Sequence, residues 1–570
     1  MTVHSAPTDL LRSWLNPLSA AQKMANHPEV AYFCAEYGLA EGLPFYAGGL
    51  GILAGDVVKA AADEDFPMVG VGLFYHGKRD RQVVDPDGWQ HYVPYEFDPE
   101  GQGFTEVMLP DGTPWRTTLH LDGDEVHVFA LARHLSEHVT VYFLETDRPI
   151  NPPHIRELTS APYWGDERMQ LQQQFVLGAG GIRLLRDLDL MPEVFHLNEG
   201  RPAVLVWELA EWLQETLGHD GCRAIQEARE RIVYTNHTLV RAGNLSYPWD
   251  LVERFVEPWA QALGMPTSAL LECGIDDHED RFGITEFGLA MSRIASGVSE
   301  RHTELCREQW PEFSWVNITN GVHFPTWQRQ ELVMDDLTDA EIWRAHQDAK
   351  KELVDEAARR TGIMYDPERL VLGWARRITG YKRLDSLFVD VERLRSILSR
   401  VDRPVQLVVA GKAHPGDQQA KEHLQEIIRI FQNELSGHAL FIPNYDMELA
   451  RYLVSGVDIW LNTPVDGREA CGTSGMKAAA NGVLQASVAD GWVAEVDITD
   501  IGWTLEPENP GEHIMNLLDG EWADLFWQRD AAGVPKAWIQ RMRASQQLAK
   551  SFSATRMLRE YQEKLYTSTV

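Results

Sequence analysis

The sequence lacks several features that define whole classes of protein. Its five cysteines are odd in number and widely spaced, and none forms a CxxC pair. This argues against a disulfide framework or a zinc site, so we expect reduced thiols and no bound metal. No apolar run approaches the ~20 residues that cross a bilayer, and the start MTVHSAPTDLLRSW shows no signal peptide. We therefore expect a soluble, cytoplasmic protein without a membrane partner.

Basic residues are also scarce. There are 52 lysines and arginines against 85 aspartates and glutamates, which gives a formal net charge of -33. A surface of this sign repels nucleic acid and anionic lipid, so we expect no nucleic-acid partner. The acidic excess by itself indicates little more than solubility, but it makes any basic cluster notable.

The length of 570 residues exceeds one ordinary core, since ~100–200 residues per domain is usual. From Leu370 onward the apolar runs LVLGW, VQLVVAG, ALFIP, VDIWLN and VLQAS alternate with helical patterns such as 383–400. Such alternation predicts a doubly wound parallel sheet. We expect an N-terminal domain over 1–335, a second over 336–548, and a final helical segment over 549–570 that packs back on the first.

The segment REACGTSGMKAAANG, residues 468–482, combines a turn, a helix start and a lysine. Gly472 permits a tight turn, Thr473 and Ser474 can cap a helix, and free N–H groups at the helix start can receive an anion. Lys477 lies one turn inside, beside small alanines that leave room for a bulky group. This suits a Schiff base with pyridoxal phosphate. An ordinary capped helix with a surface lysine would explain the segment as well.

The segment WARRITGYKRLD, residues 374–385, follows an apolar strand and carries Arg376, Arg377, Lys382 and Arg383. Guanidinium groups bind phosphate oxygens in pairs, and lysine adds a point charge. A solvated basic turn is the plain alternative. The position favours a site, because ligands of open α/β sheets bind at the carboxyl ends of strands.

Two further features are weaker on their own. In YAGGLGILAGD, Gly48 and Gly49 would let backbone N–H groups approach an oxyanion, although a tight turn needs such glycines too. Asn198 with Glu199 in HLNEGRP and His237 in TNHT each follow an apolar strand. A lone histidine there is more often a core residue than a catalyst. Together with TNGVHFPTW, these segments could converge on one cleft.

Taken together, the segments resemble the α-glucan phosphorylases, the family of glycogen and maltodextrin phosphorylases, and most of all its short bacterial and archaeal branch. The resemblance runs in order from AYFCAEYGLAEGLPFYAGGLGILAGDVVKAAAD to GTSGMKAAANG and DGW, so it covers most of the chain. GTSGMK and ARRITGYKR are its most diagnostic parts. It implies an α/β fold of two Rossmann-like domains facing a central cleft, the family B glycosyltransferase fold.

The same resemblance implies an activity. The expected reaction is reversible phosphorolysis of α-1,4-glucans or maltooligosaccharides by inorganic phosphate, which gives α-D-glucose 1-phosphate with retention. The expected cofactor is pyridoxal phosphate, whose own phosphate relays a proton. Because family members are often dimers, a homodimer is implied as well.

The resemblance assigns roles to residues at matching positions. A first set would hold the cofactor, with Lys477 as the point of attachment: Lys477, Thr473, Ser474, Arg376 and Trp327. A second set would act in catalysis, His237 through its main-chain carbonyl: His237, Arg377, Lys382 and Glu469. A third set would contact the substrate: Gly48, Gly49, Asn198, Glu199, Asn320, Tyr381, Cys471 and Gly472.

Some positions depart from the family pattern. Cys471 stands where serine is usual, Arg201 replaces a common histidine, and TNHTLVRAGNLSYPWDL differs from the usual branch sequence. These changes leave phosphate and cofactor handling intact but leave the glucan acceptor open.

Two other functions remain as alternatives. A nucleotide-sugar glucosyltransferase of the same fold would use the basic cluster but would not need Lys477. A non-catalytic glucan-binding protein would not need to keep Lys477, Arg377 and Lys382. A glycoside hydrolase fits worse, because it would rely on two carboxylates and leave the basic cluster idle.

Overall fold

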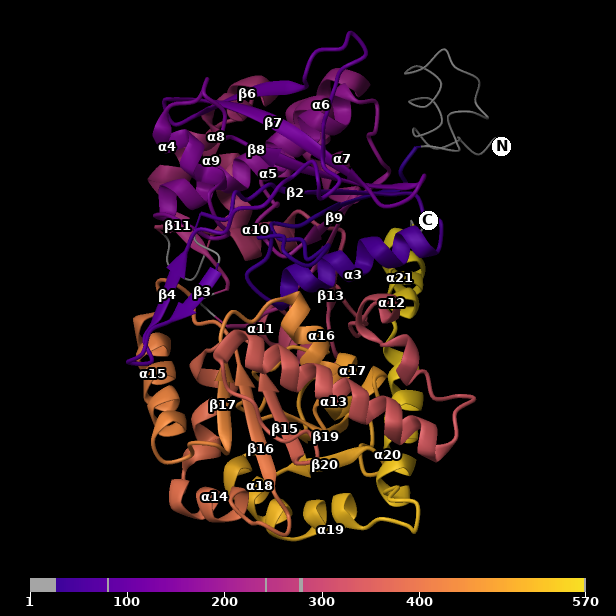
Figure 1. Ribbon diagram of the computed structural model, residues 1–570. Coiled ribbons are helices and arrows are strands. Elements are labelled where there is room, and N and C mark those ends of the chain that lie inside the picture. Colours follow the sequence, from indigo (N-terminus) through magenta and orange to yellow (C-terminus); the bar gives the residue numbers. More distant parts are fainter. Residues whose placement is uncertain (1–26, 79–80, 241–242, 276–279, 568–570) are drawn as a thin grey trace, which may run out of the picture.

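The computed structural model describes residues 27–78, 81–240, 243–275 and 280–567 (Figure 1). The N-terminal start MTVHSAPTDLLRSW lies outside the described residues. Figure 1 shows an upper half, drawn from indigo to magenta, and a lower half, drawn mostly in orange and yellow. Each half contains one large sheet, and the predicted α/β class with parallel sheets is confirmed. In the described part of the chain, no helix is long and apolar enough to cross a membrane.

The upper sheet has ten strands, in the order β14-β13-β10-β9-β1-β2-β8-β7-β5, with β6 beside β7. The strands from β14 to β8 are parallel, and their centre is fully buried, as a sheet covered on both faces requires. The parallel strands are β14 (Trp315–Asn317), β13 (Ile294–Gly297), β10 (Ile232–Thr235), β9 (Val194–Asn198), β1 (Val30–Phe33), β2 (Met68–Leu73) and β8 (Val139–Glu145). The antiparallel edge consists of β7 (Asp124–His134), β6 (Arg116–Leu121) and β5 (Thr105–Glu106).

The lower sheet has six strands, all parallel, in the order β17-β16-β15-β18-β19-β20. Counted along the chain, this order is 3-2-1-4-5-6. The first three strands build the sheet from β15 toward one edge, and the last three build it from β18 toward the other edge. A crevice therefore opens at the carboxyl ends of β15 and β18. The strands are β15 (Leu370–Ala375), β16 (Val405–Ala410), β17 (Ala439–Ile442), β18 (Ile459–Asn462), β19 (Leu484–Val488) and β20 (Gly502–Leu505).

The five strands predicted after Leu370 are confirmed, but the helix predicted over 383–400 is wrong as a single element. It forms a 3₁₀ turn over Leu384–Phe388 and then the helix α14 (Val391–Leu398). The Asp390 carboxylate accepts a hydrogen bond from the main-chain N–H of Arg393 and so starts a new helix.

Helices connect the strands and cover the sheets (Figure 1). In the upper half they are α3 (Gly49–Asp63), α4 (Pro153–Arg156), α5 (Glu167–Asp187), α6 (Leu205–Leu217), α7 (Gly221–Glu230), α8 (Trp249–Leu263), α9 (Thr267–Leu271), α10 (Ile284–Ala290), α11 (Glu300–Gln309) and α12 (Phe324–Trp327). In the lower half they are α13 (Asp339–Thr361), α14, α15 (Gln418–Gln432), α16 (Met447–Gly456), α17 (Thr473–Ala480), α18 (Pro510–Asp519), α19 (Glu521–Trp527) and α20 (Lys536–Ala549).

Each half has its own apolar core, and the last helix, α21 (Ala554–Tyr561), belongs to the upper one. Met557, Leu558 and Tyr561 are buried in the core of the upper sheet. In Figure 1 α21 continues upward from α20 and lies beside α3. The chain therefore crosses between the halves twice. A smaller buried cluster, which includes Ile52 and Trp492, joins the halves.

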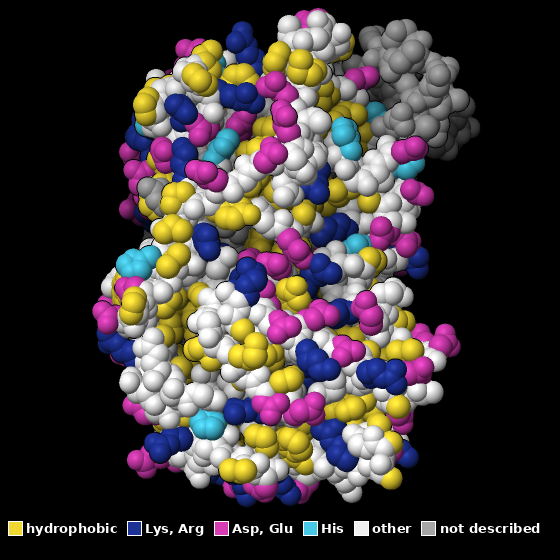
Figure 2. Space-filling model, viewed as in Figure 1, with side chains coloured by type: hydrophobic (Ala, Val, Ile, Leu, Met, Phe, Trp, Pro, Cys, Tyr) yellow, Lys and Arg dark blue, Asp and Glu magenta, His cyan; other side chains and the backbone are white. Residues whose placement is uncertain are grey.

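Two small antiparallel sheets complete the upper half. One pairs β11 (Ser246–Pro248) with β12 (Arg281–Gly283), which α8 and α9 separate in the chain, and the other is a hairpin of β3 (Arg81–Val84) and β4 (Gln90–Val93). The β3–β4 hairpin reaches down beside α15 of the lower half (Figure 1). On the face drawn in Figure 2, acidic and basic side chains are interspersed.

Candidate active site between the two halves

Lys477 lies inside the protein and not on its surface, so the surface-lysine alternative is wrong. Only 7% of the residue is exposed, and its Nζ lies 3.9 Å from the centroid of the Trp327 ring. Burial lowers the pKa of Lys477 to about 8, although the nearby Asp56 carboxylate opposes that shift. Asp56 also accepts hydrogen bonds from Trp327 Nε1 at 3.0 Å. The amine can therefore lose its proton far more easily than an ordinary lysine.

The helix that carries Lys477, α17, begins differently from the prediction. Its N-cap is Gly472, whose φ of 84° lies in the left-handed region that favours glycine, and no side chain caps the helix. The prediction that Thr473 and Ser474 cap it is wrong, because both already lie inside the helix. Ser474 Oγ instead accepts a hydrogen bond from Trp460 Nε1 at 3.3 Å. The first N–H groups of α17 are thus left for an anion.

Of the four cations after β15, Arg383 donates to main-chain carbonyls such as that of Thr463, and the other three occupy different environments. Arg376 is 7% exposed, donates to the Asn462 side chain, and has a buried Nε without a hydrogen-bond partner in the described chain. Lys382 is 9% exposed and pairs with Glu469. The solvated-turn alternative is wrong for these two residues. Arg377 is exposed and lines the cavity described below.

Glu469 is the counter-charge of this cluster. Its Oε2 binds Lys382 and lies 3.4 Å from Arg376 Nη1. Burial would raise the pKa of Glu469, but the two cations outweigh burial and hold the pKa below its usual value. Asp490 accepts a hydrogen bond from the main-chain N–H of Glu469 at 2.8 Å and fixes its backbone. Glu469 is therefore ionised. It neutralises the positive charge of Lys382 and Arg376, and a bound phosphate could neutralise the same positive charge.

The glycine loop before α3 is held from one side and open on the other. The Glu36 carboxylate accepts hydrogen bonds from the main-chain N–H groups of Ala47 at 2.7 Å and Gly48 at 3.1 Å. No heavy atom lies within 4 Å of the place where a Cβ on Gly48 or Gly49 would sit. The first turn of α3 has no side-chain cap. The geometry suits an approaching anion, but a simple turn explains it too, so both interpretations stay open.

Asn198, Glu199 and His237 meet where β9 and β10 end. Asn198 Oδ1 lies 2.6 Å from His237 Nε2, and Glu199 Oε1 accepts a hydrogen bond from the main-chain N–H of His237 at 2.5 Å. Loss of water around the ring lowers the pKa of His237 to about 3, so the ring is neutral. Burial raises the pKa of Glu199 to about 7. The His237 ring is thus satisfied as a structural histidine would be, and Asn198 and Glu199 orient this residue.

Three other predicted residues lie on the lower half or at its border. Asn320 is 4% exposed, and its Oδ1 has no hydrogen-bond partner in the described chain. Cys471 is also buried, and its main-chain oxygen accepts a hydrogen bond from the Trp492 N–H at 2.9 Å. The ring of Tyr381 lies 4.7 Å from Lys382 Nζ. The unsatisfied oxygen of Asn320 could accept a hydrogen bond from a ligand hydroxyl.

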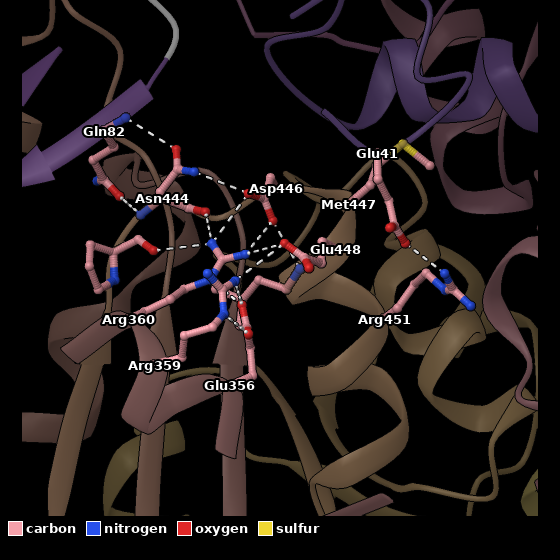
Figure 3. Close-up of polar contacts among 12 residues, drawn as sticks. Glu41, Gln82, Glu356, Arg359, Arg360, Asn444, Asp446, Met447, Glu448 and Arg451 are labelled. Carbon is pink, nitrogen blue, oxygen red and sulfur yellow. Dashed lines mark hydrogen bonds and ion pairs between the residues drawn. The ribbon is translucent and has the colours of Figure 1, made fainter. Parts of the chain in front are cut away.

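A cavity of about 510 Å³ lies between the halves. Tyr46 and Ala47, next to the glycine loop, line it from above, and Arg377 and Tyr445 line it from below. Lys477 is not part of its lining. Figure 3 shows one wall of this cavity, where carboxylates surround the guanidinium groups of Arg359 and Arg360.

Charges on that wall are paired. Arg360 contacts Glu356, Asp446 at 3.1 Å and Glu448 at 3.1 Å, and Arg359 also pairs with Glu356 (Figure 3). Within the described residues, no ion pair involves Arg377. Arg377 is therefore better placed than Arg359 or Arg360 to receive an incoming anion.

The structure brings the predicted residues together in groups. Lys477 lies with Trp327, and Arg376, Lys382 and Glu469 form a second group. In the part of the chain that the structure describes, no hydrogen bond or ion pair joins Lys477 to the second group. No group of histidine, cysteine, aspartate or glutamate among the described residues could hold a metal ion.

Sequence reasoning missed Asp56 and Glu36. Asp56 ends the glycine-rich segment YAGGLGILAGD and lies two turns into α3, where an acidic residue among apolar neighbours was an available signal. Glu36 gave no such signal, because its contacts form only in the fold. Its carboxylate also accepts from the Tyr163 hydroxyl, and the Arg201 guanidinium lies 4.1 Å from the Tyr163 ring. The unusual Arg201 therefore supports the underside of the glycine loop.

Comparisons with known proteins give the same family for this chain. The model of the carbohydrate phosphorylase family matches residues 327–502. The chain is 33% identical to a glycogen phosphorylase of Aquifex aeolicus, over 98% of this chain and 89% of that protein. It is 34% identical to a maltodextrin phosphorylase of Thermococcus litoralis, over 99% of this chain and 74% of that protein. It is also 30% identical to an uncharacterised protein of Methanocaldococcus jannaschii, over 94% of this chain and 99% of that protein.

Proposed function

The chain belongs to the carbohydrate phosphorylase family, and from this membership we propose that it catalyses the reversible phosphorolysis of α-1,4-glucans or maltooligosaccharides. The proposed product is α-D-glucose 1-phosphate, with retention of the anomeric configuration. The observation that carries the proposal is a buried amine, Lys477, whose Nζ lies over the Trp327 ring.

The residues around Lys477 fit pyridoxal phosphate. A covalent link to the cofactor needs a neutral amine, and the pKa of Lys477 is lowered to about 8. Trp327 offers an aromatic face, and the alanines that follow Lys477 are small and buried. The cofactor phosphate would be bound by the start of α17, which has no side-chain cap and carries Thr473 and Ser474. The Nε of Arg376, which has no hydrogen-bond partner among the described residues, would donate to the same phosphate. When bound, the cofactor supplies a phosphate group that can give and take a proton beside the substrate phosphate.

The chain's own residues would bind and orient the substrate phosphate. Arg377 lines the cavity from the lower half, and we assign the backbone of the glycine loop at Gly48 and Gly49, which follows the lining residue Ala47 and has open space beside it, to the upper half of the phosphate site. Lys382 is buried beside Glu469 and contributes a fixed positive charge. Two phosphates at close range repel each other, so concentrated positive charge is what the reaction needs most.

The glucosyl unit would be held by hydrogen bonds from the same walls. Glu469 is ionised and can accept from sugar hydroxyls, and the unsatisfied Asn320 Oδ1 can do the same. Cys471 and Gly472 follow Glu469 in the chain, and Tyr381 lies beside Lys382, the partner of Glu469. We assign the main-chain carbonyl of His237 to the anomeric carbon, because Asn198 and Glu199 fix that residue.

The proposal includes the domain architecture. We assign the family B glycosyltransferase fold, with an N-terminal domain over 1–335, a C-terminal domain over 336–548 and a returning segment over 549–570. The strand order of the lower sheet and the separate apolar cores support this division. The contacts of Met557, Leu558 and Tyr561 with the upper core support the returning segment.

The decisive assay measures sugar release from a panel of α-glucans and maltooligosaccharides, with inorganic phosphate present or omitted. We expect glucose 1-phosphate only when phosphate is present, and we expect visible absorbance from a cofactor in the same sample. Lys477→Ala should lose both. Glucosyl transfer that needs a nucleotide sugar and ignores phosphate would contradict the proposal.

A further inference from the structure

Two buried glutamines connect the β3–β4 hairpin of the upper half to the lower half. Gln82 and Gln90 are each 2% exposed, although the hairpin projects away from its own core. Their amides bind each other, because Gln82 Nε2 donates to Gln90 Oε1 at 2.6 Å. A buried amide is costly unless it is hydrogen-bonded, so these side chains must have definite partners.

The partners lie on the segment that follows β16. Gln82 Nε2 donates to the Gly411 carbonyl at 2.9 Å. Gln90 makes a two-way contact with the backbone of Ala413: its Nε2 donates to the carbonyl at 3.0 Å, and its Oε1 accepts from the N–H at 3.0 Å. Since a backbone N–H can only donate, this geometry fixes which way the Gln90 amide faces. The hydroxyl of Tyr92 donates to the same carbonyl at 2.6 Å.

The other edge of this segment holds the residues around Arg377. Ile378 pairs with Ala413 as a parallel bridge, and the Ile378 N–H donates to the Lys412 carbonyl at 3.0 Å. The Arg376 N–H donates to the Ala410 carbonyl at 3.2 Å. A Cβ on Gly411 would lie 2.2 Å from the Arg376 carbonyl oxygen, so the two segments touch backbone to backbone. Any shift of 411–413 therefore moves the backbone on both sides of Arg377.

Gln82 also holds a second segment of the cavity wall. Its main-chain N–H donates to Asn444 Oδ1 at 3.2 Å, and its Oε1 accepts from the Asn444 N–H at 2.7 Å. Figure 3 shows the side chain of Asn444 donating a hydrogen bond to Asp446, at 3.0 Å. Asp446 in turn caps α16 and pairs with Arg360. The hairpin is thus hydrogen-bonded to two segments of the lower half, residues 411–413 and the segment at Asn444.

Docking of the hairpin does not depend on these amides alone. Near its tip, Gln425 and Arg429 of α15 donate to the Asp87 carbonyl at 3.1 and 3.2 Å. The Lys421 ammonium lies 5.3 Å from the centroid of the Trp89 ring. These contacts hold the tip against α15 and do not touch 411–413. The contacts at the tip are enough to dock the hairpin on α15. The additional effect of the two glutamines is to fix the positions of Gly411 and Ala413.

We propose that Gln82 and Gln90 are positioning residues for the substrate phosphate, because they act through Gly411 and Ala413 on the backbone that carries Arg377. The inference rests on the proposed function, which makes Arg377 a phosphate ligand. It implies that the phosphate site of the lower half is complete only while the upper half's hairpin is docked. Gln90 itself does not line the cavity that Arg377 lines.

The test uses the full-length holoenzyme and three matched glutamine-to-methionine variants, since methionine keeps the volume of glutamine and loses its hydrogen bonds. Gln90→Met should raise the KM for inorganic phosphate about tenfold and leave the KM for maltoheptaose within about twofold. Gln82→Met should act in the same direction. Gln425→Met, which loses only a contact at the tip, should leave both constants unchanged. Titration calorimetry with inorganic phosphate should show the same loss for Gln90→Met as a rise in Kd.

Three results would overturn the inference: an unchanged phosphate KM in Gln90→Met, an equal rise of both KM values, or the same phosphate defect in Gln425→Met. Tyr92→Phe removes one hydroxyl from the Ala413 carbonyl and keeps the ring, so it serves if Gln90→Met does not fold. Its phosphate KM should rise about twofold, and a wild-type value would count against the inference. If the wild-type protein shows no phosphate-dependent release of sugar, the proposed function fails, whatever the variants do.

Discussion

Attachment of pyridoxal phosphate to the apoprotein should follow the titration of Lys477. Burial lowers the pKa of this amine from 10.5 to about 8. At pH 7 the neutral fraction is then ~10%, against ~0.03% for an ordinary lysine, a gain of about 300-fold in reactive amine. The rate constant for attachment, followed by the rise in visible absorbance, should increase about tenfold per pH unit up to pH ~8 and then level off.

Asp56 provides the control for this prediction. Its carboxylate favours the protonated amine, so Asp56→Asn should lower the pKa of Lys477 and move the plateau to lower pH. Lys477→Ala should show no attachment at any pH. A rate that keeps rising to pH 10, as for an exposed lysine, would refute the reasoning, and so would a plateau that moves upward in Asp56→Asn.

Three other predictions follow from single residues. Arg377→Ala should lower kcat/KM for phosphate by about 10²–10³, measured by initial rates, and an unchanged value would contradict its role. Asp458→Ala should cost about 3–5 kcal/mol in urea unfolding, because it leaves buried Lys350 without its partner at 2.8 Å. Glu199 has a pKa raised to about 7, so it contributes stability below pH ~4.5 that is lost as the pH rises through 7. Glu199→Gln should flatten that part of the stability profile.

The fold could be predicted best where the pattern is local. The strands β15 to β19 are mostly apolar and buried at every residue, as a parallel sheet covered on both faces requires. β20 escaped prediction because one of its four residues, Thr504, is polar and exposed, which interrupts the buried apolar pattern of the other strands. The helix over 383–400 was wrong for a reason that is also local, since Asp390 acts as a cap within an otherwise helical pattern.

The site could be predicted only in part. The segments that carry Lys477 and Arg377 were found because their glycines and cations are contiguous in the sequence. Gln82 and Gln90 carried no signal, since glutamines on short strands suggest a solvated hairpin. Their partners lie 329 and 323 residues away, so only the fold shows that they are buried and paired. The error at Thr473 and Ser474 had another source, because Gly472 adopts a left-handed backbone that itself begins the helix.

The central claim is that inorganic phosphate, and not water, takes the glucosyl unit from an α-glucan. Phosphorus NMR of a mixture of maltoheptaose, inorganic phosphate and the cofactor-loaded protein tests it directly. The account predicts that the signal of inorganic phosphate declines while that of α-D-glucose 1-phosphate grows, and that neither changes with Lys477→Ala. Appearance of the β anomer, or release of free glucose while the phosphate signal stays constant, would contradict it.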